Sequence, residues 1–90
     1  MTSEMRSIAC IGDSTTHGGR IITGSDTMDI KGRGMARMGD LVTCPEHGTN
    51  PIIQCSDRLT DTNGNGVALD GHLTACGSRL IAYEDHGSVG

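Results

Sequence analysis

The chain of 90 residues carries a formal net charge of −4, and only 34% of its residues are apolar, with no Trp, no Phe and a single Tyr. A chain of this length forms one small domain, and a core this poor in aromatic side chains needs help from a metal, disulfides or a partner chain. The lack of a basic run and of aromatic platforms for bases excludes nucleic-acid binding as a function, and no apolar stretch reaches transmembrane length.

The elements expected along the chain are short strands separated by turns. Apolar stretches of three to five residues alternate with clusters of Gly, Asn, Asp and Pro, and Gly interrupts every candidate helical period. The expected strands, in chain order, span residues 8–11, 20–23, 28–30, 35–38, 52–55, 67–70 and 79–83. Hairpin turns are expected at 31–33 and 63–66, where Gly and Asn suit positive backbone dihedrals. The pattern predicts an all-β fold with little or no helix.

One local signal occurs three times and divides the chain into repeats. A Gly is followed by polar residues that include a Thr, and a His or Cys stands five positions after the Gly. The three copies run over residues 12–17, 39–44 and 71–76. An Ala before each copy and an apolar pair after it also match. We therefore expect a single domain over 1–90, with strand-turn-strand repeats at about 7–33, 34–65 and 66–83 and a tail over 84–90.

Candidate metal ligands gather in these repeats. They are His17, Cys44, His47, His72 and Cys76, with His86 as a weaker candidate. Donors at equivalent places in three repeats can converge on one point, and nitrogen with sulfur donors at one point is typical of zinc. A structural zinc contributes on the order of 10 kcal/mol, which a core this small needs. The repeat alignment favours Cys44 over His47 or His72, so the residues alone leave open which four bind.

The remaining cysteines and the chain start bear on the redox state. Residues 1–6 lack the apolar stretch of a secretory signal, so we expect synthesis in the cytosol, where thiols stay reduced. Reduced Cys favours metal ligands or inert thiols over disulfides. Cys10 and Cys55 lie in strand-like apolar contexts and are expected to be buried free thiols.

Other functions are conceivable from the same residues. Residues 61–66 match the opening of a calcium loop, but His72 stands where the bidentate Glu belongs and no helices flank the loop. Cys44 with His47 imitates a nucleophile–base pair, although a pair three residues apart in a Pro-containing loop suits a metal loop better. A zinc hydrolase would need an open coordination position. A small metal-binding or redox module that uses the Cys is a further alternative.

Taken in order, the motifs resemble the PAAR-repeat family, the sharpening tips of type VI secretion spikes. The resemblance covers about residues 7–83. It is carried by Gly12-Asp13-x-x-Thr16-His17-Gly18-Gly19, Ile22-x-Gly24-Ser25, Gly34-Met35-Ala36-Arg37-Met38-Gly39-Asp40, Cys44-Pro45-x-His47-Gly48 and Thr74-x-Cys76-Gly77-Ser78. The chain departs from the family in three ways. The literal four-letter motif is absent, its nearest form being residues 34–37, the third Gly-Asp is Gly71-His72, and Cys55 replaces the usual small residue.

The resemblance implies a small cone-shaped β domain with one structural zinc near its apex. In the family the ion is held by three His and one Cys, a pattern that maps here onto His17, His47, His72 and Cys76. The implied role is structural rather than enzymatic: the domain caps the trimeric valine-glycine-repeat spike protein and sharpens it for membrane puncture. The tip of a contractile phage tail is an alternative from the same resemblance.

The resemblance also implies partners and a location. The partners would be the trimeric spike and effector proteins whose delivery the tip aids, with transient contact to the target membrane. The isolated domain is expected to be a monomer. It would reside in the cytoplasm of the producing bacterium and then be secreted or translocated into target cells without a signal peptide.

Overall fold

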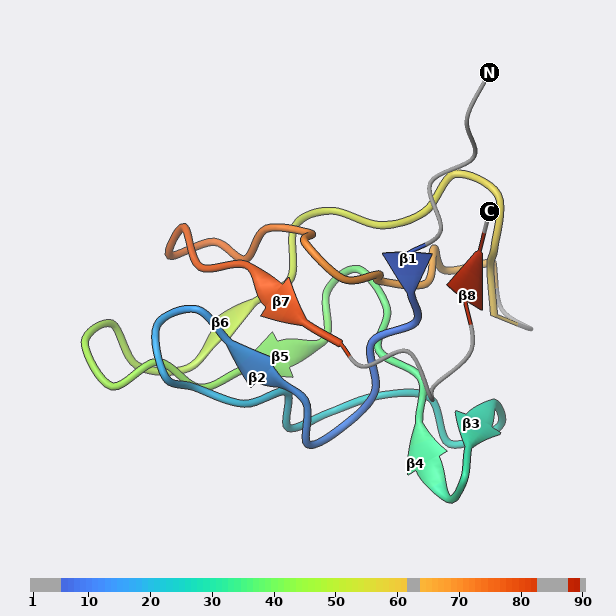
Figure 1. Ribbon diagram of the computed structural model, residues 1–90, viewed down its shortest axis with the longest axis horizontal. Helices are drawn as coiled ribbons and strands as arrows, with labels where there is room; N and C mark the ends of the chain where they lie inside the picture. The colour runs from blue at the N-terminus through green and yellow to red at the C-terminus, as the bar shows by residue number, and fades with distance from the viewer. Residues whose placement is uncertain (1–5, 62–63, 83–87, 90) are drawn as a thin grey trace.

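The computed structural model describes residues 6–61, 64–82 and 88–89, and within these residues the fold is all-β, as predicted. No helix occurs among the described residues, and so none with the length and apolar character needed to cross a bilayer. In the described part of the chain the two-residue strands are β1 (Arg6–Ser7), β2 (Ser14–Thr15), β3 (Asp29–Ile30), β4 (Arg33–Gly34), β5 (Leu41–Val42), β6 (Asn50–Pro51), β7 (Leu80–Ile81) and β8 (Ser88–Val89). They form the antiparallel pairs β1–β8, β2–β7, β3–β4 and β5–β6 (Figure 1).

The strands are shorter than the sequence predicts. Much of the remaining ladder consists of isolated antiparallel bridges, such as Ile8 with Leu69 and Arg37 with Val67. The chain changes direction after one or two paired residues because left-handed Gly residues interrupt each segment, as at Gly39 with φ of 94°. Each predicted apolar run contains paired residues, but of the named strands only β3 and β7 lie within a predicted run; the others lie outside.

The two expected hairpin turns have different outcomes. Lys31 and Gly32, with φ of 54° and 83°, form the two-residue turn between β3 and β4, where Gly and a left-handed residue are required. At 63–66, Asn63 lies outside the described residues. Among the described residues, Thr60 forms a bridge with Gly66, and Gly64 has a φ of 88°.

The three repeats meet in a closed ring of three alanines. The amide of Ala9 donates to the carbonyl of Ala68 at 3.0 Å, Ala68 donates to Ala36 at 2.8 Å, and Ala36 donates back to Ala9 at 2.8 Å. Each of the three is fully buried. Every repeat thus supplies one donor and one acceptor at its equivalent position, which gives the described part of the chain a pseudo-threefold centre.

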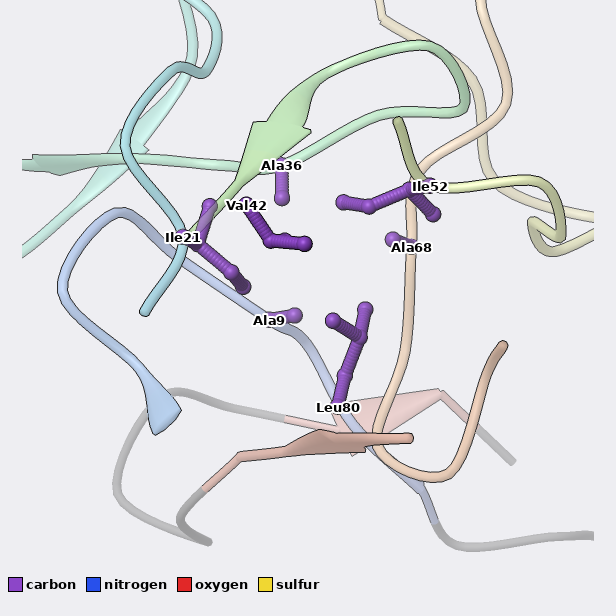
Figure 2. Packing of buried hydrophobic residues seen from close by; sticks show 7 residues of the cluster. All are labelled: Ala9, Ile21, Ala36, Val42, Ile52, Ala68 and Leu80. Atoms are coloured by element: carbon purple, nitrogen blue, oxygen red, sulfur yellow. The ribbon is translucent and has the colours of Figure 1, made fainter. Parts of the chain in front are cut away.

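The main hydrophobic cluster lies around this ring. Ile21, Ile52 and Leu80 stand at equivalent positions, each 1% exposed, and together with Val42 they point toward a common centre (Figure 2). The cluster consists of Ala9, Ile21, Ala36, Val42, Ile52, Ala68 and Leu80. Small residues in the ring leave space for the larger side chains, so the core closes without an aromatic side chain among the described residues.

Each repeat projects a loop that the same hydrogen bond closes. The amide of Gly12 donates to the carbonyl of Ile21 at 2.9 Å, and the bonds of Gly39 to Ile52 and Gly71 to Leu80 repeat this contact at 2.9 and 2.8 Å. The enclosed loops, which include β2, β5 and β6, extend to the left-hand end of the molecule in Figure 1. The β3–β4 hairpin and the β1–β8 pair lie at the other end.

The two ends of the chain complete the third repeat. The carbonyls of Gly34 in the first repeat and Gly66 in the second accept the amides of Ile11 and Met38 at 2.9 Å each. In the third repeat the equivalent acceptor is the carbonyl of Ser7, which receives the amide of Asp70 at 2.8 Å. The β1–β8 pair therefore occupies the place of a third hairpin. Of the expected tail over 84–90, only Ser88 and Val89 are among the described residues.

Candidate metal centre

The turn that begins each loop fixes a polar side chain in the same way in all three repeats. Asp13 accepts the amide of Cys10 at 2.9 Å, and Asp40 accepts the amide of Arg37 at 2.8 Å. In the third repeat the Nδ1 atom of His72 accepts the amide of Leu69 at 2.9 Å. All three polar side chains are buried.

His72 thus accepts the same backbone hydrogen bond in its turn as Asp13 and Asp40 accept in theirs. Its Nδ1 lone pair is engaged by a backbone amide and is not directed at an ion. A neutral imidazole has one acceptor nitrogen, so this hydrogen bond also fixes the tautomer with the proton on Nε2.

Four other side chains converge at the end of the loops. They are His17, Cys44, His47 and Cys76, whose donor atoms all lie within 4.8 Å of one another. His17, Cys44 and Cys76 each stand five residues after the Gly of their repeat, so the pseudo-threefold arrangement brings all three together. His47 is supplied by the longer loop of the second repeat.

The loops of the first and third repeats present their donors on matching turns. In the first, the amide of Gly18 donates to the carbonyl of Thr15 at 3.1 Å, and Gly18 has a φ of 85°. In the third, Gly77 donates to Thr74 at 3.0 Å with a φ of 92°. His17 and Cys76 precede these glycines and are therefore held at equivalent places on the two turns.

Gly19 allows the first and second loops to approach closely. A Cβ atom at Gly19 would overlap the carbonyl of Thr43, so no other residue fits without displacing the backbone. The Thr43 amide donates to the carbonyl of Arg20 at 2.8 Å, which keeps the two loops in contact. His17 and Cys44 are brought together by this contact.

The second loop places its two donors on one turn and is tied to the third loop. The amide of Gly48 donates to the carbonyl of Cys44 at 2.8 Å, closing the turn that carries His47. The Asn50 side chain accepts the amide of Cys76 at 3.1 Å, and the Pro51 carbonyl accepts the amide of Ala75 at 2.8 Å. All three loops are therefore positioned by hydrogen bonds within the chain.

The donor separations fit a tetrahedral ion with nitrogen and sulfur ligands. The Sγ atom of Cys44 lies 3.3 Å from Nδ1 of His47 and 3.7 Å from Nδ1 of His17, and the Sγ atom of Cys76 lies 3.6 Å from the same His17 nitrogen. Zinc bonds of about 2.0–2.3 Å in tetrahedral geometry place adjacent donors about 3.3–3.8 Å apart. These three separations fall in that range, and all four donor atoms lie within 4.8 Å of one another.

The surroundings favour the thiolate form of Cys76. Hydrogen bonds with the Thr74 and Ser78 hydroxyls, at 3.4 and 3.6 Å, are the main causes that lower the pKa of the Cys76 thiol to about 5. Burial opposes the shift, and the Ser78 amide and His17 add smaller contributions to it. Since the thiolate is the form that binds metals, this sulfur is ready to bind an ion at neutral pH.

The described residues define a class of protein: a small β domain of three pseudo-repeated units whose loops carry a candidate metal centre at one end. The PAAR motif model matches residues 11–82, and the chain belongs to the PAAR motif family. That family is one of structural spike tips. A search of curated proteins gave no match.

The structure places the expected ligands in two locations. His17, His47 and Cys76 lie in the group together with Cys44, whereas His72 lies in the Gly-Asp type turn next to Leu69. His86 is outside the described residues. The repeat alignment pointed to Cys44, and the family pattern of three His and one Cys pointed to His72. In the structure His72 stands in the position of the Asp of the other repeats and accepts the amide three residues before it.

Proposed function

We propose that this chain is the tip of a type VI secretion spike and that it caps a trimeric valine-glycine-repeat spike protein. The closed ring of Ala9, Ala36 and Ala68 carries the proposal. It arranges three repeats of one chain about a single axis, and such an arrangement can present equivalent surfaces to the three subunits of a trimer. Membership of a spike-tip family supports the same conclusion.

The two ends of the molecule suit different tasks. Short paired strands at the hairpin end, β3–β4 and β1–β8, offer edges that can extend the β-structure of a spike by strand pairing. The loops with the His and Cys side chains lie at the opposite end, which would lead into the target membrane. In this role the domain forms a cone that sharpens the spike for membrane puncture and aids effector delivery. It acts in the cytoplasm of the producing cell before translocation.

We further propose that His17, Cys44, His47 and Cys76 hold one structural zinc ion, with Cys44 in the place that the family pattern gives to His72. Four protein donors complete a tetrahedral site and leave no position for a reactive water, so the site suits a structural ion rather than a hydrolytic one. When bound, the ion would tie the loops of all three repeats to one point and add on the order of 10 kcal/mol to the stability of a small core.

Metal content and cobalt spectra test the ligand set. The wild-type chain should carry one zinc per molecule, and the cobalt-substituted form should show thiolate charge-transfer bands with a tetrahedral d–d spectrum. Cys44→Ser should lose most of the metal affinity, whereas Cys55→Ser, a matched change of a thiol outside the group, should keep it. An unchanged thermal melt after complete metal removal contradicts the structural role.

Co-purification with a candidate trimeric spike tests the docking. One tip per trimer is the expected stoichiometry, because the three repeats together use all three subunits. Recovery of three tips per trimer, or of none, contradicts a tip that docks along a common axis.

A further inference from the structure

Two of the four thiols in this chain lie in the same group of donors. The Sγ atoms of Cys44 and Cys76 are within 4.8 Å of each other and flank one nitrogen of His17, at 3.7 and 3.6 Å. Cys10 is fully buried in a second hydrophobic cluster with Ile8, Met35, Val67 and Leu69. Cys55 packs so closely against Gly66 that a Cβ atom at position 66 would overlap the Cys55 sulfur. None of the four forms a disulfide in the structure.

The loops that carry Cys44 and Cys76 are held together independently of any ion. Asn50 and Pro51, which follow Cys44 in its loop, accept the amides of Cys76 and Ala75 at 3.1 and 2.8 Å. A bridge between Ile52 and Thr74 continues this contact into the core. The two sulfur atoms therefore stay near each other when the site is empty, which is the condition for joining them without unfolding the domain.

We propose that Cys44 and Cys76 form an oxidation site for hydroperoxides, at which a disulfide takes the place of the metal. The inference rests on the proposed metal site, since the same two thiolates serve both states. Hydrogen peroxide is the oxidant. One thiolate attacks a peroxide oxygen, giving a sulfenic acid and hydroxide, and the second thiolate attacks the sulfenic sulfur, releasing a second hydroxide. Two electrons pass from the sulfurs to the peroxide, and the hydroxides take up protons to become two waters.

Disulfide formation changes which repeats are tied together. It consumes two of the four donors, and His17 with His47 is too small a set to hold the ion tightly. The bond links the second and third repeats, while His17 of the first repeat loses the ion as a common ligand partner. Oxidation would therefore release the ion and leave the first loop held by its hydrogen bonds to the other two loops alone.

The experiment treats the zinc-loaded full chain with stoichiometric hydrogen peroxide and follows three readouts. We expect the free-thiol count to fall from four to two, one zinc per chain to appear in a chromophoric chelator assay, and a cross-linked peptide to join Cys44 to Cys76 with the loss of two hydrogen atoms in mass. Dithiothreitol followed by zinc should restore the starting state. The metal-free wild type should form the same disulfide, because the hydrogen bonds between the loops do not depend on the ion.

Matched variants separate this site from the other thiols. Cys10→Ser and Cys55→Ser should form the same Cys44–Cys76 cross-link and release the same zinc as the wild type, with a thiol count that falls from three to one, and Cys44→Ser should form no cross-link. Survival of all four thiols, oxidation of Cys76 to a sulfinic acid without a cross-link, or a disulfide that involves Cys10 or Cys55 overturns the inference. The metal content measured before peroxide is added reports on the metal site alone, so a chain that binds zinc but forms no Cys44–Cys76 bond refutes this inference and leaves the proposed function standing.

Discussion

His72 can be replaced by the residue that the other two repeats carry at its position. In those repeats a carboxylate oxygen of Asp13 or Asp40 accepts a backbone amide at 2.9 or 2.8 Å, and His72 accepts the amide of Leu69 at 2.9 Å. An Asp at position 72 can therefore make the same bond. Hydrogen bonds to charged acceptors contribute about 1.5–3 kcal/mol against about 0.5–1.5 kcal/mol for neutral ones, a gain that offsets the lost packing of the ring.

We expect His72→Asp to keep one zinc per chain and a free energy of unfolding within about 1 kcal/mol of the wild type. His72→Ala should also keep its zinc but should lose about 1–3 kcal/mol, because the Leu69 amide is then buried without an acceptor. In a domain of this size each kcal/mol lowers the melting temperature by about 4–8 °C.

The assay is zinc content by mass spectrometry together with thermal and urea unfolding of the zinc-loaded variants. Loss of zinc in both variants, with a melting temperature as low as that of Cys44→Ser, would show that His72 is a ligand after all. Equal stability of the Asp and Ala variants would refute the turn-forming role of this side chain.

Three further predictions concern packing, loop contact and charge. Ile52→Ala, at a side chain 1% exposed, should lower the free energy of unfolding by about 2–5 kcal/mol, whereas Ile53→Ala, at a neighbour 50% exposed, should change it by about 0.5 kcal/mol or less in urea titrations. Gly19→Ala should weaken zinc binding in competition with a chelator, because its Cβ pushes the Thr43 carbonyl away; unchanged affinity contradicts the close approach of these loops. In the metal-free protein, iodoacetamide should alkylate Cys76 at a nearly constant rate down to about pH 6, because its pKa of about 5 lies below the ordinary thiol value. The lowered pKa means that the stabilisation of the thiolate is present at high pH and is lost as the pH falls through 5; a rate that already drops below pH 8 contradicts it.

The sequence was sufficient for the fold class but not for the lengths and positions of the strands. Composition and Gly spacing indicate the fold class, because the fold class follows from local backbone preferences. Strand length depends on how three distant segments wrap about one axis, and β1 with β8 shows the difficulty most clearly: its two strands come from opposite ends of the chain. No local sequence pattern indicates that the Ser7 carbonyl accepts the Asp70 amide of the third repeat.

The candidate site was predictable to the extent that it follows the repeat. His17, Cys44 and Cys76 stand at one offset from their glycines, and the structure groups them. His72 is different because one residue type serves two purposes, as a metal donor and as an acceptor for backbone amides. Only the contact with the Leu69 amide shows which nitrogen is engaged, and spacing along the chain carries no such information.

The triangle of alanine amides has a consequence for how this architecture can evolve. Stacked solenoids gain or lose units because each unit touches only its neighbours along an open array. Here each of the three alanines donates its amide hydrogen bond to another, so the three hydrogen bonds form a closed cycle. Deleting one repeat would leave a buried backbone amide and a buried carbonyl without hydrogen-bond partners. Inserting a repeat would break the closed cycle of hydrogen bonds. The number of repeats is therefore restricted to three, whereas the loops outside the ring can vary.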